Sequence, residues 1–115
     1  MQYVFHEPEE YGFKDRDGHN GKFFGTSSDT TQHMIIECDD KLTVSLTQHK
    51  TEFNYYILEG EGYFVLNNDM QAVLRGDLVV VPPETEYTFG GKLKMLLINT
   101  PKWSANQETT KELFD

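Results

Sequence analysis

The sequence predicts an all-β protein, and three observations carry this prediction. Between residues 32 and 99, about eight short stretches are rich in aliphatic and aromatic residues. They recur about every ten residues, a spacing typical of antiparallel sandwiches and barrels. Glycine, asparagine and proline separate the stretches, and these residues favour turns. The fold class is therefore a barrel or sandwich of antiparallel strands.

Each strand is predicted from its local pattern. Residues 42–47 alternate leucine or valine with threonine or serine, which is the period of a strand. Residues 67–69 (NND) predict a hairpin turn, and residues 75–77 (RGD) predict another. Pro82 and Pro83 end the preceding strand because proline donates no ladder hydrogen bond. The predicted strands lie at residues 34–36, 42–47, 55–58, 63–66, 72–74, 78–81, 87–89 and 92–99.

The segment before the barrel is predicted to be an irregular arm. It comprises residues 1–30, ahead of a barrel at about residues 31–100. The arm is rich in glycine and acidic residues, which favours turns over regular structure. Short strands are expected within it at residues 2–6 and 22–26, where aromatic residues occur. The whole chain, residues 1–115, has the length of a single domain.

The tail after the barrel, residues 101–115, is predicted to be helical or irregular. Ser104 and Gln107 have the three-residue spacing of a capping box, which is a signature of a helix start. A short helix is therefore expected over residues 105–114. Few apolar residues follow, so little of this helix would be anchored on the barrel.

Charge and composition exclude several classes of function. The chain has 115 residues with 19 acidic and 10 basic ones, for a net charge of −9. Nucleic acids and anionic membranes attract Lys and Arg, so neither is an expected partner. No run approaches the ~18 apolar residues of a membrane helix, and residues 1–7 lack the regions of a secretion signal. With Cys38 as the single cysteine, these observations favour a reducing, cytoplasmic location.

The strand at residues 42–49 allows two interpretations. Its two faces carry Leu42, Val44 and Leu46 on one side and Ser45, Thr47 and His49 on the other. In the first interpretation the apolar face lies in the core, and His49 is a surface residue. In the second, the polar face lines the lumen of a ligand-binding barrel, and the apolar face packs on a second layer or a partner subunit. A slip of one residue in register separates the two.

The next strand favours an enclosed polar face. Residues 53–58 are largely apolar on both faces, with Phe53 and Tyr55 on one side and Tyr56 and Leu58 on the other. A strand that is apolar on both faces is covered on both, as in the middle of a two-layer β fold. The second interpretation, with His49 in the lumen, gains support from this pattern.

Two motifs resemble those of the cupin superfamily. Residues 55–62 (YYILEGEG) look like the end of the first cupin motif, and residues 76–87 (GDLVVVPPETEY) look like the second. The interval between them also suits the family. The resemblance implies a cupin-type jelly-roll β-barrel, usually dimeric. Cupins include oxygenases, sugar isomerases and epimerases, lyases and simple binders, so the fold leaves the activity open.

The resemblance also implies where a cupin metal would bind. The four positions that carry metal ligands in the family are occupied here by Thr47, His49, Phe53 and Tyr87. One of the four is a good ligand, whereas zinc, iron and manganese sites need three or four donors. The sequence therefore predicts no metal or other cofactor. An alternative keeps a divalent metal at a rebuilt site made of His49, Glu52 and His33.

In the cupin register the lumen is expected to combine aromatic walls with hydroxyls and one imidazole. Such a pocket suits a sugar-like or carboxylate-like metabolite, or another small polar or cyclic molecule. A phosphate would need a cation at the mouth, from Arg75, Lys50 or Arg16. The candidate ligand-binding residues are Ser45, Thr47, Phe53, Tyr55, Phe89 and Asn99, and the candidate catalytic residues are His49 and Tyr87.

Three functions remain open at this point. The first is a binding module that holds a small metabolite without metal. The second is a metal-independent isomerase or epimerase, in which His49 takes a proton and Tyr87 or Tyr55 returns it, because histidine titrates near working pH. The third is a metal-dependent oxygenase or lyase at the rebuilt site around His49.

A homodimer is also predicted. In the second interpretation of residues 42–49, Leu42, Val44 and Leu46 face outward and need a cover, which another protomer would supply. Trp103, just after Pro101, is expected to cover the end of the barrel or to lie in that interface.

Overall fold

The computed structural model describes residues 2–26 and 28–113. These residues form an all-β structure, as predicted, and none of their helices is long and apolar enough to cross a membrane. The strands are β1 (Phe13–Arg16), β2 (His19–Phe23), β3 (Gln32–Cys38), β4 (Val44–Gln48), β5 (Glu52–Leu66), β6 (Asp69–Leu74), β7 (Leu78–Val81), β8 (Glu86–Thr100) and β9 (Glu108–Glu112), with a 3-10 turn, η1 (Ala105–Gln107), before β9.

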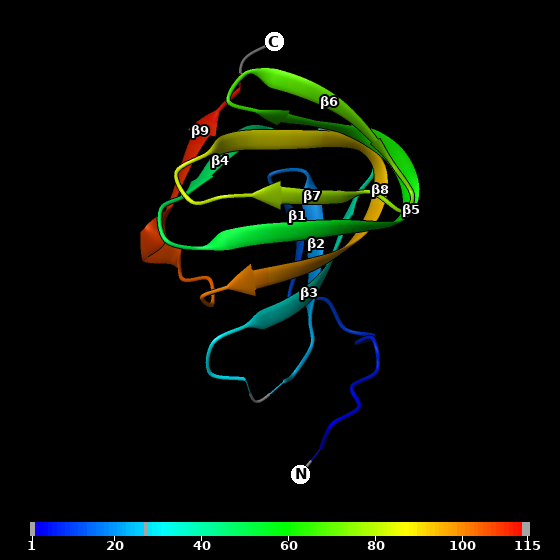
Figure 1. Ribbon diagram of the computed structural model, residues 1–115. Helices are drawn as coiled ribbons and strands as arrows, with labels where there is room; N and C mark the ends of the chain where they lie inside the picture. The colour runs from blue at the N-terminus through cyan, green and yellow to red at the C-terminus, as the bar shows by residue number, and fades with distance from the viewer. Residues whose placement is uncertain (1, 27, 114–115) are drawn as a thin grey trace.

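The strands belong to one sheet that curls into a barrel (Figure 1). One wall has the order β1-β2-β3-β8-β4-β9, and β5 with β6 and β7 completes the other. The 15-residue strands β8, in the first wall, and β5, in the second, join the two walls by pairing antiparallel from Glu52↔Thr100 to Leu66↔Tyr87. Because this one ladder runs through both walls, it fixes the position of every side chain that points inward from β5 and β8.

A glycine allows β5 and β8 to approach closely where their register shifts. The shift lies between Ile57 and Glu59, next to Gly60. Gly60 has a φ of +93°, a left-handed conformation that glycine adopts without strain. A Cβ at this position would also overlap the carbonyl oxygen of Lys92 on the paired strand. The glycine of the first sequence motif is thus required by the backbone.

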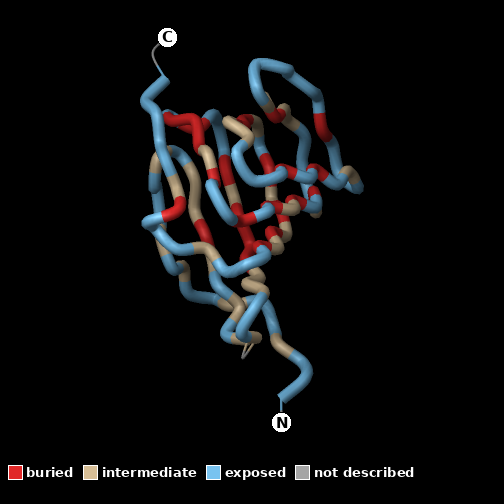
Figure 2. Tube along the Cα trace, turned by 60° about the vertical axis from the view of Figure 1, so that its left-hand side comes forward, coloured by how far each residue is buried: buried red, intermediate tan, exposed pale blue. Residues whose placement is uncertain are grey.

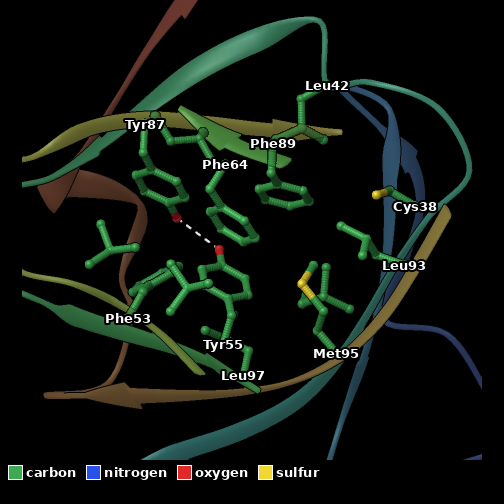
Figure 3. Packing of buried hydrophobic residues seen from close by; sticks show 14 of the residues in the cluster. Cys38, Leu42, Phe53, Tyr55, Phe64, Tyr87, Phe89, Leu93, Met95 and Leu97 are labelled. Carbon is green, nitrogen blue, oxygen red and sulfur yellow. Dashed lines mark hydrogen bonds between the residues drawn. The ribbon is translucent and has the colours of Figure 1, made fainter. Parts of the chain in front are cut away.

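Aromatic rings fill the centre of the barrel (Figure 3). Tyr55, Phe64, Tyr87 and Phe89 are each at most 2% exposed. Phe64 stacks on Phe89 with 5.0 Å between ring centroids, and Tyr55 lies 5.2 Å from Phe64. Buried positions concentrate on the strands, whereas the N-terminal segment and most of the turns are exposed (Figure 2). The core therefore lies inside the curled sheet, where the cupin register predicted a lumen.

The register of β4 corresponds to the first of the two interpretations. Leu42, Val44 and Leu46 are at most 5% exposed and belong to the core cluster. Because side chains alternate along a strand, Ser45 and Thr47 point to the opposite face. The prediction that the polar face of this strand lines the lumen is wrong. The physical reason is the hydrophobic effect, because burial of the three aliphatic side chains stabilises the fold by about 1.5–3 kcal/mol for each.

The N-terminal arm is more regular than predicted. Residues 1–30 contain the hairpin of β1 and β2, and β2 pairs with β3 from His19↔Cys38 to Phe23↔Met34. The short strand expected at residues 22–26 is thus the end of β2, whereas residues 2–6 form no strand. The hairpin extends the sheet because the outer edge of β3 offers a ladder of backbone groups that the arm satisfies.

The C-terminal tail is not helical. Among residues 101–113, the 3-10 turn η1 is the only helical element, Ser104 makes no side-chain cap hydrogen bond, and β9 follows. β9 pairs with β4 from Val44↔Glu112 to Gln48↔Glu108. The five-residue strand β9 pairs with the backbone N–H and C=O groups on the free edge of β4. A short helix with few apolar residues would be only marginally stable and would leave this edge unpaired. Phe114, at the end of the expected helix, lies outside the described residues.

Candidate functional site

A cavity of about 60 Å³ lies inside the barrel. Its walls come from the β1–β2 hairpin, from β3, β4, β5 and β8, and from the segment that follows β8. Most lining side chains are apolar or aromatic. The exceptions carry the chemistry and are Arg16, Asp17, His19, Tyr55, Asn99 and Glu108. This arrangement, with apolar walls and a few polar groups, is typical of small-molecule sites.

Two tyrosines form a hydrogen-bonded pair behind the cavity. Tyr55 Oη lies 2.8 Å from Tyr87 Oη, and both side chains are buried (Figure 3). Burial raises the pKa of both Tyr55 and Tyr87 because a phenolate would be poorly solvated there. Both hydroxyls are therefore protonated near neutral pH. Of the pair, Tyr55 lines the cavity and can donate to a ligand.

A polar network connects this pair to the exposed end of the cavity. Gln48 Nε2 donates to Glu108 Oε2 at 2.7 Å, and Trp103 Nε1 donates to the same oxygen at 2.9 Å. Gln107 Nε2 donates to Gln48 Oε1 at 2.6 Å. A hydrogen bond from Gln48 also partly offsets the effect of burial on the pKa of Tyr87. The network places the Glu108 carboxylate at the cavity although it comes from β9, on the edge of the sheet.

The partly exposed lining side chains Arg16, Trp103 and Glu108 form what we call the rim of the cavity. The Arg16 guanidinium lies over the Trp103 ring, 5.4 Å from its centroid, and 5.7 Å from the centroid of Phe13. Such contacts are worth about 0.5–1 kcal/mol at exposed sites, which is little enough for Arg16 to move. Of the three cations considered from the sequence, Arg16 is the one that lines the cavity.

Two cavity residues carry buried polar atoms that have no partner among residues 2–26 and 28–113. These atoms are Asn99 Oδ1 and His19 Nδ1. Asn99 is fully buried, and its Nδ2 donates to Gln32 Oε1 at 3.0 Å. Burial lowers the pKa of His19, so its imidazole is neutral at pH 7. An amide oxygen and a neutral imidazole are thus available to a polar ligand.

The lowered pKa of His19 predicts a loss of stability in acid. The unfolded chain, with histidine at 6.5, binds a proton more readily than the folded chain. The contribution of neutral His19 to the free energy of unfolding is fully present above pH 6.5, and it is lost as the pH falls from 6.5 toward the lower pKa of the folded state. We expect the free energy of unfolding from urea titrations to decrease between pH 7.5 and pH 5.5, about one unit either side of the ordinary histidine pKa.

His19→Gln is the variant that tests the origin of this pH dependence. It removes the titrating group, so its unfolding free energy should vary less over the same range. His6→Gln, at an exposed histidine, is the matched control and should keep the wild-type dependence. An unchanged pH profile in His19→Gln would contradict the assignment.

Five of the residues predicted for the lumen lie inside the barrel. Phe53, Tyr55 and Asn99 line the cavity. Tyr87 and Phe89 pack behind them, at most 1% exposed, in the aromatic core. The catalytic role predicted for Tyr87 stays a prediction, but Tyr87 does not line the cavity, and its hydroxyl contacts the lining residue Tyr55.

The other three do not line the cavity, although Ser45 is buried. His49 is exposed, with Nδ1 3.0 Å from Glu84 Oε1 and Nε2 2.6 Å from Thr109 Oγ1. Ser45 donates to Glu86 Oε2 at 3.3 Å, and Thr47 shares its face of β4. The lumen placement of His49, Ser45 and Thr47 was therefore wrong, because the register of β4 differs by one residue from the one the cupin resemblance implied.

The rebuilt metal site of His33, Glu52 and His49 is not assembled. In the described part of the chain, no three His, Cys, Asp or Glu side chains come together as metal ligands would. Glu52 is exposed and accepts from Asn54 Nδ2 at 3.0 Å, and His49 contacts Glu84 instead. The donor set of that alternative is scattered over the outside of the barrel, so it does not fit a metal ion.

Sequence reasoning did not single out His19, Gln48 or Glu108 as site residues. His19 follows an Asp-Gly turn sequence, which signals the hairpin that carries it. Gln48 ends the alternating stretch on its apolar face, a position where a polar side chain is unusual and could have been noticed. Glu108 carried no signal, because the pairing of β9 with β4 joins segments about 60 residues apart.

Comparison with solved structures identifies the fold. Pac13 of Streptomyces, described as a nucleoside dehydratase, matches with a TM-score of 0.89 at 20% identity, over 100% of this chain and 95% of Pac13. Variants of Pac13 with one histidine or one tyrosine replaced are solved with uridine. The cupin domain of Schizosaccharomyces pombe Cnp3 matches with a TM-score of 0.64 at 11% identity, over 73% of this chain and 65% of that one. The chain has a cupin-type fold.

Comparison of sequences adds a curated relative but no function. An uncharacterized protein of Methanocaldococcus jannaschii is 38% identical over 64 residues. The match covers 51% of this chain and 51% of the relative, so the alignment spans about half of its length. No family model matches the chain. The cupin-type fold indicated by the two sequence motifs is thus established by structure.

Proposed function

We propose that this cupin-type barrel binds a nucleoside-like metabolite, a planar base joined to a hydroxylated sugar ring, in its cavity. The observation that carries the proposal is the pair of unpartnered buried atoms in the lining, Asn99 Oδ1 and His19 Nδ1. Buried polar groups nearly always have partners, so a polar ligand is expected to supply them. Aromatic walls suit a planar base. The whole-chain similarity to a nucleoside dehydratase favours a nucleoside over other sugars.

The size of the cavity requires the rim to move when a nucleoside enters. Its volume is about 60 Å³, against roughly 300–1,000 Å³ for typical ligand sites. The Arg16 side chain is exposed and its guanidinium lies against the rings of Phe13 and Trp103, so it can swing out at low cost. The displacement of Arg16 from the Trp103 ring changes the surroundings of the indole, which gives the binding step a spectroscopic signal.

Uridine is expected to change the fluorescence of the protein saturably. Trp103 is the single tryptophan of the chain, so the signal reports on the rim. The expected Kd is below about 1 mM, which corresponds to a binding free energy of about −4 kcal/mol. Titration of the chain with uridine, followed at the tryptophan emission maximum, measures it.

Two controls accompany the uridine titration. Glucose, which has hydroxyls but no planar base, is expected to give no saturable change at the same concentrations. Trp103→Phe should abolish the signal while calorimetry still detects uridine. A titration in which uridine and glucose behave alike would count against the nucleoside proposal.

Dehydration is a second candidate, favoured by the placement of an acid and a base on one cavity. Loss of water from a β-hydroxy carbonyl nucleoside needs a base that takes the C–H proton and an acid that protonates the departing hydroxyl, as the carbon–carbon double bond forms. Neutral His19 is suited to the first role and protonated Tyr55 to the second. The proton on His19 then restores the tyrosine. Mass spectrometry of such a nucleoside after incubation, which detects the loss of one water, tests this candidate.

The homodimer stays a prediction, but its interface is now expected on a different surface from the apolar face of residues 42–46. The leucine face of β4 that motivated it is buried in the core. Exposed apolar side chains occur instead where the outer faces of β5 and β7 meet, with Tyr56 paired with Leu78 and with Val80 two residues further along β7. The absence of a resident metal or cofactor likewise stays a prediction.

A further inference from the structure

A chain of buried amides fixes the orientation of one carboxylate at the rim. Gln107 Oε1 accepts hydrogen bonds from the backbone N–H groups of Lys50 and Thr51, at 3.1 and 3.3 Å. Backbone N–H groups only donate, so this end of the Gln107 amide must be its oxygen. Its Nε2 therefore donates to Gln48 Oε1, which leaves Gln48 Nε2 to donate to Glu108 Oε2. The backbone thus determines, through two amides, which group meets the carboxylate.

Both hydrogen bonds to the Glu108 carboxylate end on the same oxygen. Gln48 Nε2 and Trp103 Nε1 donate to Oε2, and no group in residues 2–26 and 28–113 donates to Oε1. Each carboxylate oxygen can accept about two hydrogen bonds. Glu108 lines the cavity, so Oε1 is an acceptor with unused capacity on a lining side chain whose orientation is fixed.

We propose that Glu108 is a specificity-determining residue whose Oε1 accepts hydrogen bonds from the vicinal hydroxyls of a ribose ring, with Gln48, Trp103 and Gln107 as positioning residues. This inference deepens the proposed function and rests on it. A carboxylate that hydrogen-bonds ribose hydroxyls is a recurring device in nucleotide-binding sites. A fixed acceptor rejects an analogue without the hydroxyl because the acceptor is then left unpaired. The site therefore selects ribonucleosides over deoxynucleosides.

Calorimetric titration with uridine, 2′-deoxyuridine and 3′-deoxyuridine tests the proposal. The wild-type protein is expected to bind uridine about tenfold or more tightly than the analogue that lacks the contacted hydroxyl. Glu108→Ala should weaken the binding of uridine by a similar factor and leave the affinity for that analogue unchanged. The preference for uridine over the analogue should therefore disappear. Glu112→Ala, at an exposed glutamate on the same strand, is the matched control and should keep the preference.

A second variant covers the case in which Glu108→Ala does not fold. In Glu108→Gln the amide oxygen can replace Oε2 toward the two donors, which leaves an NH₂ group in place of Oε1 and should reduce the preference severalfold. Absence of uridine binding to the wild-type chain would overturn the proposed function and this inference together. Uridine binding without discrimination, or discrimination that survives both Glu108 variants, would overturn this inference alone.

Discussion

Replacing Phe64 with alanine is expected to lower the free energy of unfolding by about 3–5 kcal/mol. Phe64 is 0% exposed, and its ring stacks on Phe89 and Tyr87 with centroid distances of 5.0 and 6.5 Å. Alanine would leave a void where the rings of β5 and β8 meet. The paired strands cannot close over it without breaking their ladder, so the cost of the cavity adds to the lost burial. Urea denaturation followed by circular dichroism measures the change.

Two further variants distinguish the cost of a cavity in the core from the effect of removing an aromatic ring anywhere in the chain. Phe64→Leu keeps most of the apolar volume and is expected to cost markedly less than the alanine variant. Tyr3→Ala removes a ring that is 81% exposed and should change the free energy of unfolding by no more than about 0.5 kcal/mol. A loss of less than about 1 kcal/mol in Phe64→Ala would show that the ring is not a central core contact.

Gln107→Leu is expected to destabilise the protein by about 2–4 kcal/mol and to weaken nucleoside binding. The variant keeps the size of the side chain but removes the acceptor for the N–H groups of Lys50 and Thr51 and the donor to Gln48. Each buried group left unpaired costs about 1–3 kcal/mol. Gln48 is then free to turn, so Glu108 loses one of its two anchors. Unfolding in urea and calorimetry with uridine measure the two effects.

Two other substitutions in the turn η1 distinguish the loss of this hydrogen-bond network from a nonspecific effect of any substitution in the turn. Asn106→Ala alters an exposed side chain whose Oδ1 accepts only from Ser104 Oγ, and it should leave stability within about 0.5 kcal/mol of wild type. Gln107→Glu retains the acceptor for the two backbone N–H groups, so it should lose less stability than Gln107→Leu. It cannot donate to Gln48, so its affinity for uridine should still decrease. Equal effects of Gln107→Leu and Asn106→Ala would contradict the network.

Much of the strand pattern could be predicted from the sequence, because turns and alternation are local properties. Asn67 and Asn68 have φ of 47° and 69°, as a tight hairpin turn between β5 and β6 requires. Pro82 follows the last residue of β7 directly, as its missing N–H predicts. The same locality explains why the cupin-type fold was recognisable from two short motifs.

The candidate site could be predicted only in part. The positions of Phe53 and Tyr55 in the lumen followed from the cupin register of β5. His49 did not follow that register. Burial of Leu42, Val44 and Leu46 favours the opposite face, and the sequence contained that interpretation as well. An alternating strand always has two registers, and the choice depends on which one buries more apolar surface against the other wall.

The sequence by itself thus determined the fold class, the turns at residues 67–69 and 75–77 and the aromatic interior of this protein. The breaks it predicted between residues 58 and 63 and between residues 89 and 92 were wrong, because these residues lie inside the continuous strands β5 and β8. The tertiary structure alone decided the register of β4 and the conversion of the tail into β9, which together bring the buried Gln48 into hydrogen-bond contact with Glu108, a lining residue of the cavity. Local propensity encodes strands and turns within a few residues. The rim of the site is made of side chains from β1, from β9 and from the segment between β8 and β9, and only long-range pairing of edge strands brings them together.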